Sequence, residues 1–332
     1  MNLQQRLVLL KRLGDYFLTD APEWLAAREK AAYENPWFIR EFVDFQIAHI
    51  GSNFLAPEKL EAWLSRYRIP EQNLSPKNAG IIMAGNIPLA GFHDFLCAFI
   101  SGHAQTIKPS AKDSALIIHI VDKLKKWDEK AAGLIAIADR LNGCDAYIAT
   151  GSNNSGRYFD YYFSKYPHII RRNRTSVSVL TENETLEDLA ALADDVYTYF
   201  GFGCRNVTKL YVPVNYDFFP LLESFRKYTG LADNHKYKNN YDYQLAIMII
   251  NKVYYMTNGS ILLQENKALF SPVSQLNYEY YTDIREVEGV LSGNPDVQCI
   301  TGKGYVPLGK AQLPALDDYA DKADTLQFLL DL

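Results

Sequence analysis

The sequence is poor in cysteine, and none of its cysteines is spaced for a metal site. It has four cysteines in 332 residues, with no CxxC motif and no cysteine–histidine spacing of a zinc site. They are Cys97, Cys144, Cys204 and Cys299. A disulfide framework is excluded on the same ground, because disulfide-rich proteins use many closely spaced cysteines. We therefore expect reduced thiols in a cytoplasmic protein that holds no metal.

The sequence also lacks an excess of positive charge and a long apolar run. The 34 Lys and Arg residues stand against 39 Asp and Glu, a net charge of −5, which excludes a sequence-wide attraction to nucleic acid. Polar residues such as Gln4, Arg6 and Lys11 interrupt the apolar N-terminus, and no run approaches the ~18 residues that span a bilayer. We expect no membrane span, and any anionic ligand must be bound by a local group.

No repeat and no segment of biased composition divides the chain, so its organisation is read from periodicity. A length of 332 residues fits two domains of ~100–200 residues each. Through residue 75, apolar residues such as Leu7, Leu10, Leu13 and Phe17 recur at three- and four-residue steps. This spacing predicts a helical N-terminal segment over residues 1–75.

From Ala79 onward, short apolar runs alternate with helical stretches. Strands separated by helices of ~10–15 residues imply right-handed crossovers and a parallel sheet. Ligands of such sheets bind outside the carboxyl ends of the strands, where the loops 85–91, 108–113 and 150–156 should gather. The pattern predicts a nucleotide-binding α/β domain over residues 76–175.

A second alternation of strands and helices begins at residue 176. Thr185 is a plausible N-cap with Asp188 three residues on, and an apolar helical face follows it as far as Gly201. Cys204 then stands directly after Gly203, in a turn that precedes the apolar run 207–214. We predict a second α/β domain over 176–300, which carries this thiol, and a C-terminal return segment over 301–332.

Two residues could carry bond-making chemistry. Cys204 is a candidate nucleophile, because a glycine-flanked turn lets backbone N–H groups point at whatever bonds to the sulfur; the alternative is an inert buried thiol. The other three cysteines lie in apolar runs, where cysteine acts as a small hydrophobe. Asn86, after the first strand, offers an amide donor for an oxyanion, or is simply a turn former.

Two loops could hold a phosphate or a ribose. Lys108 puts one cation at the mouth of the second strand. The run 150–156 offers Gly151, Ser152 and Ser155, although it matches neither GxGxxG nor a P-loop. Taken singly, each of these signals is compatible with ordinary turn chemistry.

Taken together and in this order, the four features resemble the aldehyde dehydrogenase superfamily. They are Gly-Asn-x-Pro at 85–88, Lys-Pro-Ser at 108–110, Thr-Gly-Ser-x-x-x-Gly at 150–156 and Gly-x-Gly-Cys at 201–204. The texture of residues 174–213 and 304–330 is more similar to its acyl-CoA reductase branch, the LuxC-type fatty acyl reductases. The resemblance implies an aldehyde-dehydrogenase-like α/β fold with two parallel-sheet domains and a helical N-terminal segment.

The resemblance also implies roles for individual residues. Cys204 would be the acyl-accepting nucleophile, and Asn86 with the Cys204 backbone N–H would form the oxyanion hole. Lys108 and Ser110 would contact the adenosine ribose, and Gly151 and Ser152 would lie along the pyrophosphate. With Lys112 and Ser155 of the same two loops, they are the residues that we expect to bind the cofactor.

Two departures from the family pattern indicate cofactor and direction. The place of the glutamate that binds the ribose 2′-OH is taken by Ala111, followed by Lys112, which favours NADPH over NADH. The place of the general base falls in residues 170–174, which contain no carboxylate. Oxidation of an aldehyde to acid needs such a base to activate water, whereas reduction of a thioester does not.

We therefore expect an NADPH-dependent reductase that converts an acyl-CoA, or another fatty acyl thioester, to the aldehyde through a thioacyl-cysteine. One alternative is an NAD(P)-dependent aldehyde dehydrogenase that forms an acid or an acyl-CoA. A second alternative is a non-reducing, acyl-carrying subunit of a multienzyme complex. The acyl donor is acyl-CoA or an acyl-protein, and a homo-oligomer or a multienzyme complex is the expected assembly.

Three further features have less specific interpretations. Arg171, Arg172 and Arg174 could meet a phosphate of CoA or of the cofactor, or form a solvated strand end. His168 could act as an acid or base, or be structural. We expect the polar, aromatic stretch 235–241 to be a loop over the acyl tunnel.

Overall fold

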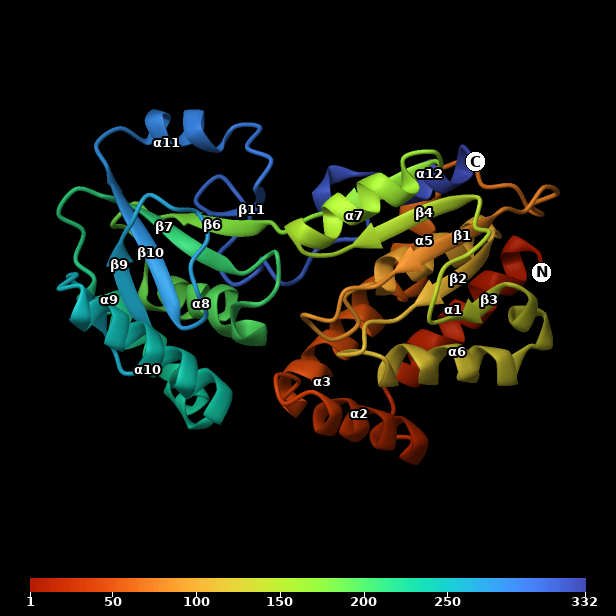
Figure 1. Cartoon of the computed structure of the whole chain (residues 1–332), viewed down its shortest axis with the longest axis horizontal. Coiled ribbons are helices and arrows are strands. Elements are labelled where there is room, and N and C mark those ends of the chain that lie inside the picture. Colours follow the sequence, from red (N-terminus) through yellow and green to blue (C-terminus); the bar gives the residue numbers. More distant parts are fainter. The chain divides into compact units, whose positions relative to one another are not determined.

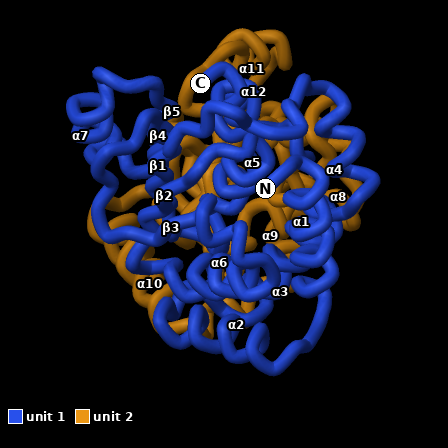
Figure 2. The backbone as a smooth tube through the Cα atoms, turned by 90° about the vertical axis from the view of Figure 1, so that its right-hand side faces the viewer, with its two compact units in different colours: residues 1–173, 315–332 blue, residues 174–314 orange.

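The computed structural model describes all residues from 1 to 332 and divides the chain into two compact units. Unit 1 comprises residues 1–173 and 315–332, and unit 2 comprises residues 174–314 (Figure 2). None of the helices combines the length and the apolar composition that crossing a bilayer requires.

Unit 1 begins with the expected helical segment. Its elements are α1 (Leu3–Phe17), α2 (Pro22–Glu34), α3 (Arg40–His49), the π-helical turn Ile50–Phe54 and α4 (Pro57–Leu64). Asn2 and Gln5 form a capping box that starts α1, and Pro22 and Pro57 stand in the first turns of their helices, where a missing N–H costs nothing.

The sheet of unit 1 is fully parallel (Figure 1). Its strands are β1 (Asn78–Ile82), β2 (Ala104–Lys108), β3 (Ile135–Ile137), β4 (Ala146–Thr150) and β5 (His168–Arg171), in the order β3-β2-β1-β4-β5. The connecting helices are α5 (Phe92–Ser101), α6 (Ala115–Trp127) and α7 (Asn153–Phe163). From β1 the chain runs through α5 and α6 to β2 and β3 on one side of β1, and it then crosses to β4 and β5 on the other side. Right-handed crossovers therefore place α7 on the face opposite to α5 and α6.

One face of this sheet is covered by several helices that share an extended apolar cluster. It includes buried residues of α1, α2, α5 and α6 together with Leu326 and Leu329 of α12 (Thr325–Leu330). The buried guanidinium of Arg6 donates to the carbonyl of Ile100 at 2.9 Å and so joins α1 to the end of α5. Gly102 ends α5 in the left-handed conformation, φ 77°, with the Arg6 side chain directly beside it.

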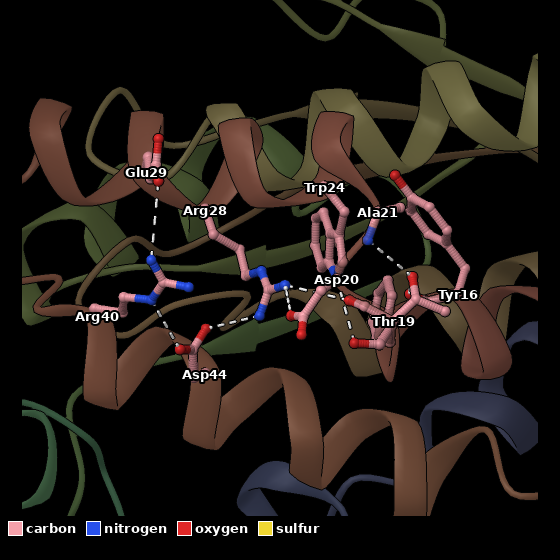
Figure 3. A network of polar contacts seen from close by, with 10 residues as sticks. Tyr16, Thr19, Asp20, Ala21, Trp24, Arg28, Glu29, Arg40 and Asp44 are labelled. Atoms are coloured by element: carbon pink, nitrogen blue, oxygen red, sulfur yellow. Dashed lines mark hydrogen bonds and ion pairs between the residues drawn. The ribbon is translucent and has the colours of Figure 1, made fainter.

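A polar network joins α2 to α3 at the edge of this helical layer (Figure 3). The guanidinium of Arg28, 8% exposed, donates to Asp44 at 3.0 Å and to Asp20 at 3.2 Å. Arg40 reaches the second oxygen of Asp44 at 3.2 Å. The network is remote in sequence from the cofactor loops, and we assign it to holding the N-terminal helices together.

Unit 2 has a six-stranded sheet that is parallel except at one edge. Its strands are β6 (Thr175–Val179), β7 (Val207–Pro213), β8 (Met256–Thr257), β9 (Leu262–Glu265), β10 (Gln275–Tyr281) and β11 (Val297–Gly302), in the order β11-β6-β7-β10-β9-β8. Only the two-residue β8 runs antiparallel to its neighbour, β9. The longer helices are α8 (Leu186–Tyr197), α10 (His235–Ile250) and α11 (Ile284–Leu291), with a short α9 (Phe219–Ser224).

The start of α8 agrees with its sequence signal, whereas α10 corrects one. Thr185 and Asp188 form a reciprocal capping box at the head of α8. Residues 235–241, expected as a loop, are the first two turns of α10. The amide oxygen of Asn234 accepts hydrogen bonds from the N–H groups of Lys236 and Tyr237 and so starts this helix, and Tyr237 and Tyr241 are buried beneath it.

Candidate active site

The carboxyl edge of the unit 1 sheet brings the predicted loops to one level. In the strand register Ile82 pairs with Lys108 on one side and with Ala149 on the other. Thr150 in turn pairs with Arg171. The loops that follow β1, β2 and β4 therefore leave the sheet side by side, as the sequence predicts for a ligand-binding edge.

The first two of these loops touch. A Cβ atom on Gly85 would lie 2.4 Å from the Ser110 Oγ and 3.2 Å from the Lys112 Cβ, so only glycine fits there. Lys108, Lys112 and Asn86 are exposed, and the Ser110 hydroxyl accepts a hydrogen bond from the Lys112 N–H at 3.2 Å. The structure thus places Asn86 one residue from a contact with the Lys-Pro-Ser loop and leaves two cations accessible at the same edge.

Asp113 holds these two loops together, and the sequence pattern did not reveal it. Its side chain is 6% exposed, and Oδ2 accepts a hydrogen bond from the Leu89 N–H at 2.7 Å. Leu89 has a left-handed backbone, φ 53°, which is strained for a branched side chain. Burial raises the pKa of the Asp113 carboxyl to about 7, against the opposing effect of the Leu89 hydrogen bond. The loop that carries Asn86 is therefore held by a group that titrates near neutral pH.

The third loop forms the N-terminus of α7. Ser152 is the N-cap, and its hydroxyl accepts a hydrogen bond from the Ser155 N–H at 3.2 Å. A Cβ atom on Gly151 would lie 2.9 Å from the Cβ of Ser155 and from the ring of Phe159. A helix N-terminus directly beyond a parallel strand is a suitable place for a phosphate group.

The arginine trio separates into different roles. Arg171 is buried and donates to Asp94 at 2.5 Å and to Thr325 at 2.6 Å, so it neither faces a ligand phosphate nor forms a solvated strand end; both interpretations are wrong for this residue. Arg172 is exposed and pairs with Asp160 of α7. His168 lies on the edge strand β5, exposed, with its Nδ1 2.8 Å from the Tyr166 carbonyl oxygen.

Cys204 lies in unit 2 and differs in exposure from the other three cysteines. It is half-buried, whereas Cys97, Cys144 and Cys299 are buried. Burial raises the pKa of the Cys97 thiol well above its ordinary value and also raises that of Cys144. A thiolate at neutral pH is thereby disfavoured at those two positions.

The turn that leads to Cys204 has an unusual backbone. Tyr199, Phe200 and Gly201 are all left-handed, with φ of 56°, 55° and 80°. For the two aromatic residues this conformation costs roughly 1–2 kcal/mol each. The turn then closes over Gly203 to Asn206, and the Cys204 carbonyl accepts a hydrogen bond from the Ser176 hydroxyl at 3.1 Å.

One buried side chain, that of Asn206, supports this turn, and a second buried polar side chain, that of Asp195, holds the segment 309–311. The side chain of Asn206, wholly buried, bonds both the end of α8 and the Gly203 N–H. Asp195 of α8, also wholly buried, accepts from the N–H groups of Gly309 at 2.7 Å and Ala311 at 2.9 Å. Burial raises the pKa of Asp195 to about 7. Neither residue stands out in the sequence, because their partners are backbone groups.

A small cavity lies beside the left-handed turn. Its volume is about 20 Å³, which suits a single water molecule and not an acyl chain. Phe200 and Gly201 line it from one side and Tyr237 of α10 from another. The cavity is therefore no substrate site in the conformation described.

No model of a known protein family matches the sequence, and no curated protein matches it either. Solved structures do match. Aldehyde dehydrogenase 21 from Physcomitrella patens, in complex with the reaction product succinate, has a TM-score of 0.71 at 12% identity, over 100% of this chain and 84% of that chain.

Two further structures are similar over most of the chain. The indole-3-acetaldehyde dehydrogenase AldA of P. syringae, in complex with NAD⁺ and IAA, has a TM-score of 0.64 at 13% identity and covers 95% of this chain and 75% of its own. An NADP dependent enzyme of E. coli has a TM-score of 0.67 at 12% identity, over 91% and 73%. At these identities the likeness establishes the fold, which is aldehyde-dehydrogenase-like as the resemblance implied.

Proposed function

We propose that the chain is a nicotinamide-dependent oxidoreductase that acts at the aldehyde level through a thioacyl group on Cys204, and that its direction is reduction of an acyl-CoA. The observation that carries the proposal is the contrast among the cysteines. Cys204 alone is not fully buried, and it stands in a glycine-flanked turn of a chain with the aldehyde dehydrogenase fold.

The carboxyl edge of unit 1 has features that suit a dinucleotide. The N-terminus of α7 offers N–H groups for a phosphate, and Lys108 and Lys112 offer positive charge nearby. Gly85 keeps the loops close, with no side chain between them. When bound, a nicotinamide nucleotide would supply the hydride. Ala111 brings no carboxylate that would repel a 2′-phosphate, and the charge of Lys112 would attract that phosphate. Both residues support NADPH over NADH.

The chain's own residues would carry the remaining steps. The Cys204 thiolate attacks the thioester carbonyl, and Asn86 with the Cys204 backbone N–H stabilises the oxyanion. Collapse breaks the carbon–sulfur bond to CoA, which leaves as a thiolate and takes up a proton. Hydride addition to the thioacyl carbon gives a hemithioacetal, and its breakdown releases the aldehyde and restores the Cys204 thiolate. One acyl-CoA, one NADPH and one proton thus give one aldehyde, one CoA and one NADP⁺.

The direction rests on residues 170–174. This end of β5 contains no carboxylate, and its only buried charged side chain, Arg171, is paired with Asp94. Activation of water against a thioester needs a general base, and none of these residues supplies one. Release of CoA needs only a good leaving group, so the absence of a base from residues 170–174 does not hinder reduction of a thioester.

Oxidation of an aldehyde is the second candidate function. The observation in its favour is that the structural neighbours named as dehydrogenases include one in complex with succinate and one with NAD⁺ and IAA. If the acceptor is CoA in place of water, the same Cys204 chemistry runs in reverse and no base for water is required.

One assay decides among these functions. The purified full chain is incubated with acyl-CoAs of several chain lengths and NADPH or NADH, and oxidation of the nucleotide is followed by absorbance. The reverse assay uses an aldehyde with NADP⁺ or NAD⁺, with and without CoA, and Cys204→Ala is the control in both. We expect acyl-CoA-dependent oxidation of NADPH that the control lacks. Oxidation of the aldehyde without CoA would establish the second candidate, and no turnover in any combination would refute both.

A further inference from the structure

We propose that Asn206 is a positioning residue for Cys204: its buried amide fixes the turn on which the thiol stands. The proposal rests on the proposed function for its catalytic consequence. Its structural part is independent, because the turn geometry exists whatever reaction the thiol performs.

Both polar atoms of the Asn206 side chain are hydrogen-bonded within the fold. Its NH₂ group lies 3.0 Å from the carbonyl oxygen of Asp195, 3.2 Å from that of Val196 and 2.8 Å from that of Thr198. Its amide oxygen accepts a hydrogen bond from the Gly203 N–H at 2.7 Å. An amide offers two N–H donors and one acceptor oxygen, so neither polar atom of this buried side chain is left without a partner.

These contacts solve a problem at the end of α8. The last four carbonyls of a helix have no partners within the helix, and those of Asp195 and Val196 belong to this set. The usual remedy is a glycine directly after the helix, whereas this chain continues through Thr198 into left-handed Tyr199 and Phe200. The Asn206 amide supplies the missing donors from eight to eleven positions further along the chain.

The same side chain also closes the turn from the other side. The Asn206 backbone N–H donates to the Gly203 carbonyl at 3.0 Å, while its side-chain oxygen accepts from the Gly203 N–H. Cys204 lies inside this closed ring of four residues. The Gly203 N–H is therefore committed to the fold and does not serve an oxyanion.

Replacement of Asn206 should therefore release both ends of the turn. The left-handed segment is strained, and without the amide its carbonyl anchors at Asp195, Val196 and Thr198 lose their donor. The backbone groups around the sulfur then lose their fixed orientation, which matters more to a transition state than to a bound substrate.

Two variants separate the donor from the acceptor contribution. Asn206→Asp keeps an acceptor for the Gly203 N–H but faces three carbonyl oxygens with no donor. Asn206→Ala removes both. Asn277→Ala is the matched control, because Asn277 is equally buried in unit 2 and its amide also donates to two carbonyls, those of Ala268 and Phe270.

The readout is alkylation of the native protein by iodoacetamide, with each cysteine quantified by peptide mass spectrometry. Cys97, Cys144 and Cys299 are buried and report global unfolding, whereas Cys204 reports its own turn. We expect both Asn206 variants to change the Cys204 alkylation rate by about fivefold or more, with the three buried cysteines still protected and with Asn277→Ala like the wild type. In the reductase assay, kcat should fall about tenfold or more with KM for both substrates within about threefold.

Three outcomes would overturn the proposal. An unchanged Cys204 alkylation rate in both variants would show that the turn does not depend on Asn206. Parallel labelling of all four cysteines would show a role in global folding only. A Cys204 alkylation rate in Asn206→Asp equal to that of the wild type would refute the role of the three carbonyl contacts. If the wild type shows no turnover at all, the proposed function fails while the alkylation result still decides the structural role.

Discussion

The loop that carries Asn86 and the turn that carries Cys204 are each held by one buried polar side chain, but the two holding groups differ in charge. Asp113 holds the Asn86 loop through the Leu89 N–H, and the Asn206 amide holds the Cys204 turn. The pKa of the Asp113 carboxyl is raised to about 7 by burial, whereas an amide does not titrate. The comparison teaches that the loop that carries Asn86 should respond to pH near neutrality, while the turn that carries Cys204 should not.

The largest expected effect is at the thiol itself. Cys204→Ala removes the only group proposed to bond the acyl carbon, so acyl-CoA-dependent turnover should fall by roughly 10⁴-fold or more. Steady-state NADPH oxidation measures the loss, and thermal unfolding of the variant checks that the fold is intact. Retention of more than a tenth of the activity would remove Cys204 from the mechanism.

The next largest effect is expected at Asn86, on the loop that Asp113 holds. Asn86→Ala removes one of the two proposed oxyanion donors and leaves the proposed nucleophile in place, so kcat should fall roughly 10²–10³-fold with a small change in KM. Asn239→Ala, an exposed asparagine of α10, serves as the control and should behave as the wild type. A rise in KM as large as the expected fall in kcat would instead assign Asn86 to substrate binding.

The charge difference predicts a pH-dependent stability. Burial raises the pKa of Asp113 in the folded protein above its value in the unfolded chain. The contribution of Asp113 to the free energy of unfolding is therefore fully present below about pH 4 and is lost as the pH rises through about 7. Asp113→Asn does not titrate, so its free energy of unfolding relative to the wild type should rise by up to roughly 1.4 kcal/mol per pH unit within that window. Urea unfolding of both proteins at several pH values measures this slope. Asp195, with a similarly raised pKa, is common to both and cancels. A difference that stays constant with pH would disprove the buried-carboxyl explanation.

The smallest effect concerns the choice between NADPH and NADH, and it is expected at Lys112, the exposed neighbour of Asp113 in the chain. Lys112→Ala removes one solvent-exposed cation, so the preference for NADPH over NADH should drop by about tenfold at low salt and by less at high salt. Lys126→Ala, in the last turn of α6, removes a similar charge at the opposite end of the helix and should leave the ratio unchanged. The ratio of kcat/KM for the two nucleotides measures the effect, and identical ratios in all three proteins would exclude Lys112 from the 2′-phosphate site.

The sequence predicted the loops of unit 1 well because their signals are local. Gly85, Lys108 and Gly151 each stand at the end of an apolar strand run, and parallel strands bring such ends to one edge. The turn at Cys204 was predicted for the same reason, from its flanking glycine. The capping pair of α8 is equally local, three residues apart in the chain.

What the sequence did not predict depends on distant or backbone partners. Arg171 reads as part of a basic cluster, yet it is paired with Asp94, 77 positions away in the chain. Asp113 and Asn206 hold the two loops through backbone N–H and carbonyl groups, which no residue pattern identifies. The start of α10 was mistaken for a loop because its polar and aromatic residues show no helical face, and only its Asn234 cap marks it as a helix.

The central claim is that Cys204 accepts the acyl group and that reduced nucleotide then releases it as an aldehyde. It is tested most directly by peptide mass spectrometry of the protein after incubation with acyl-CoA in the absence of nucleotide. The account predicts an acyl adduct on Cys204 and on no other cysteine, and its discharge as aldehyde when NADPH is added. Absence of the adduct would contradict the claim, and an adduct that NADPH cannot discharge would show an acyl carrier in place of a reductase.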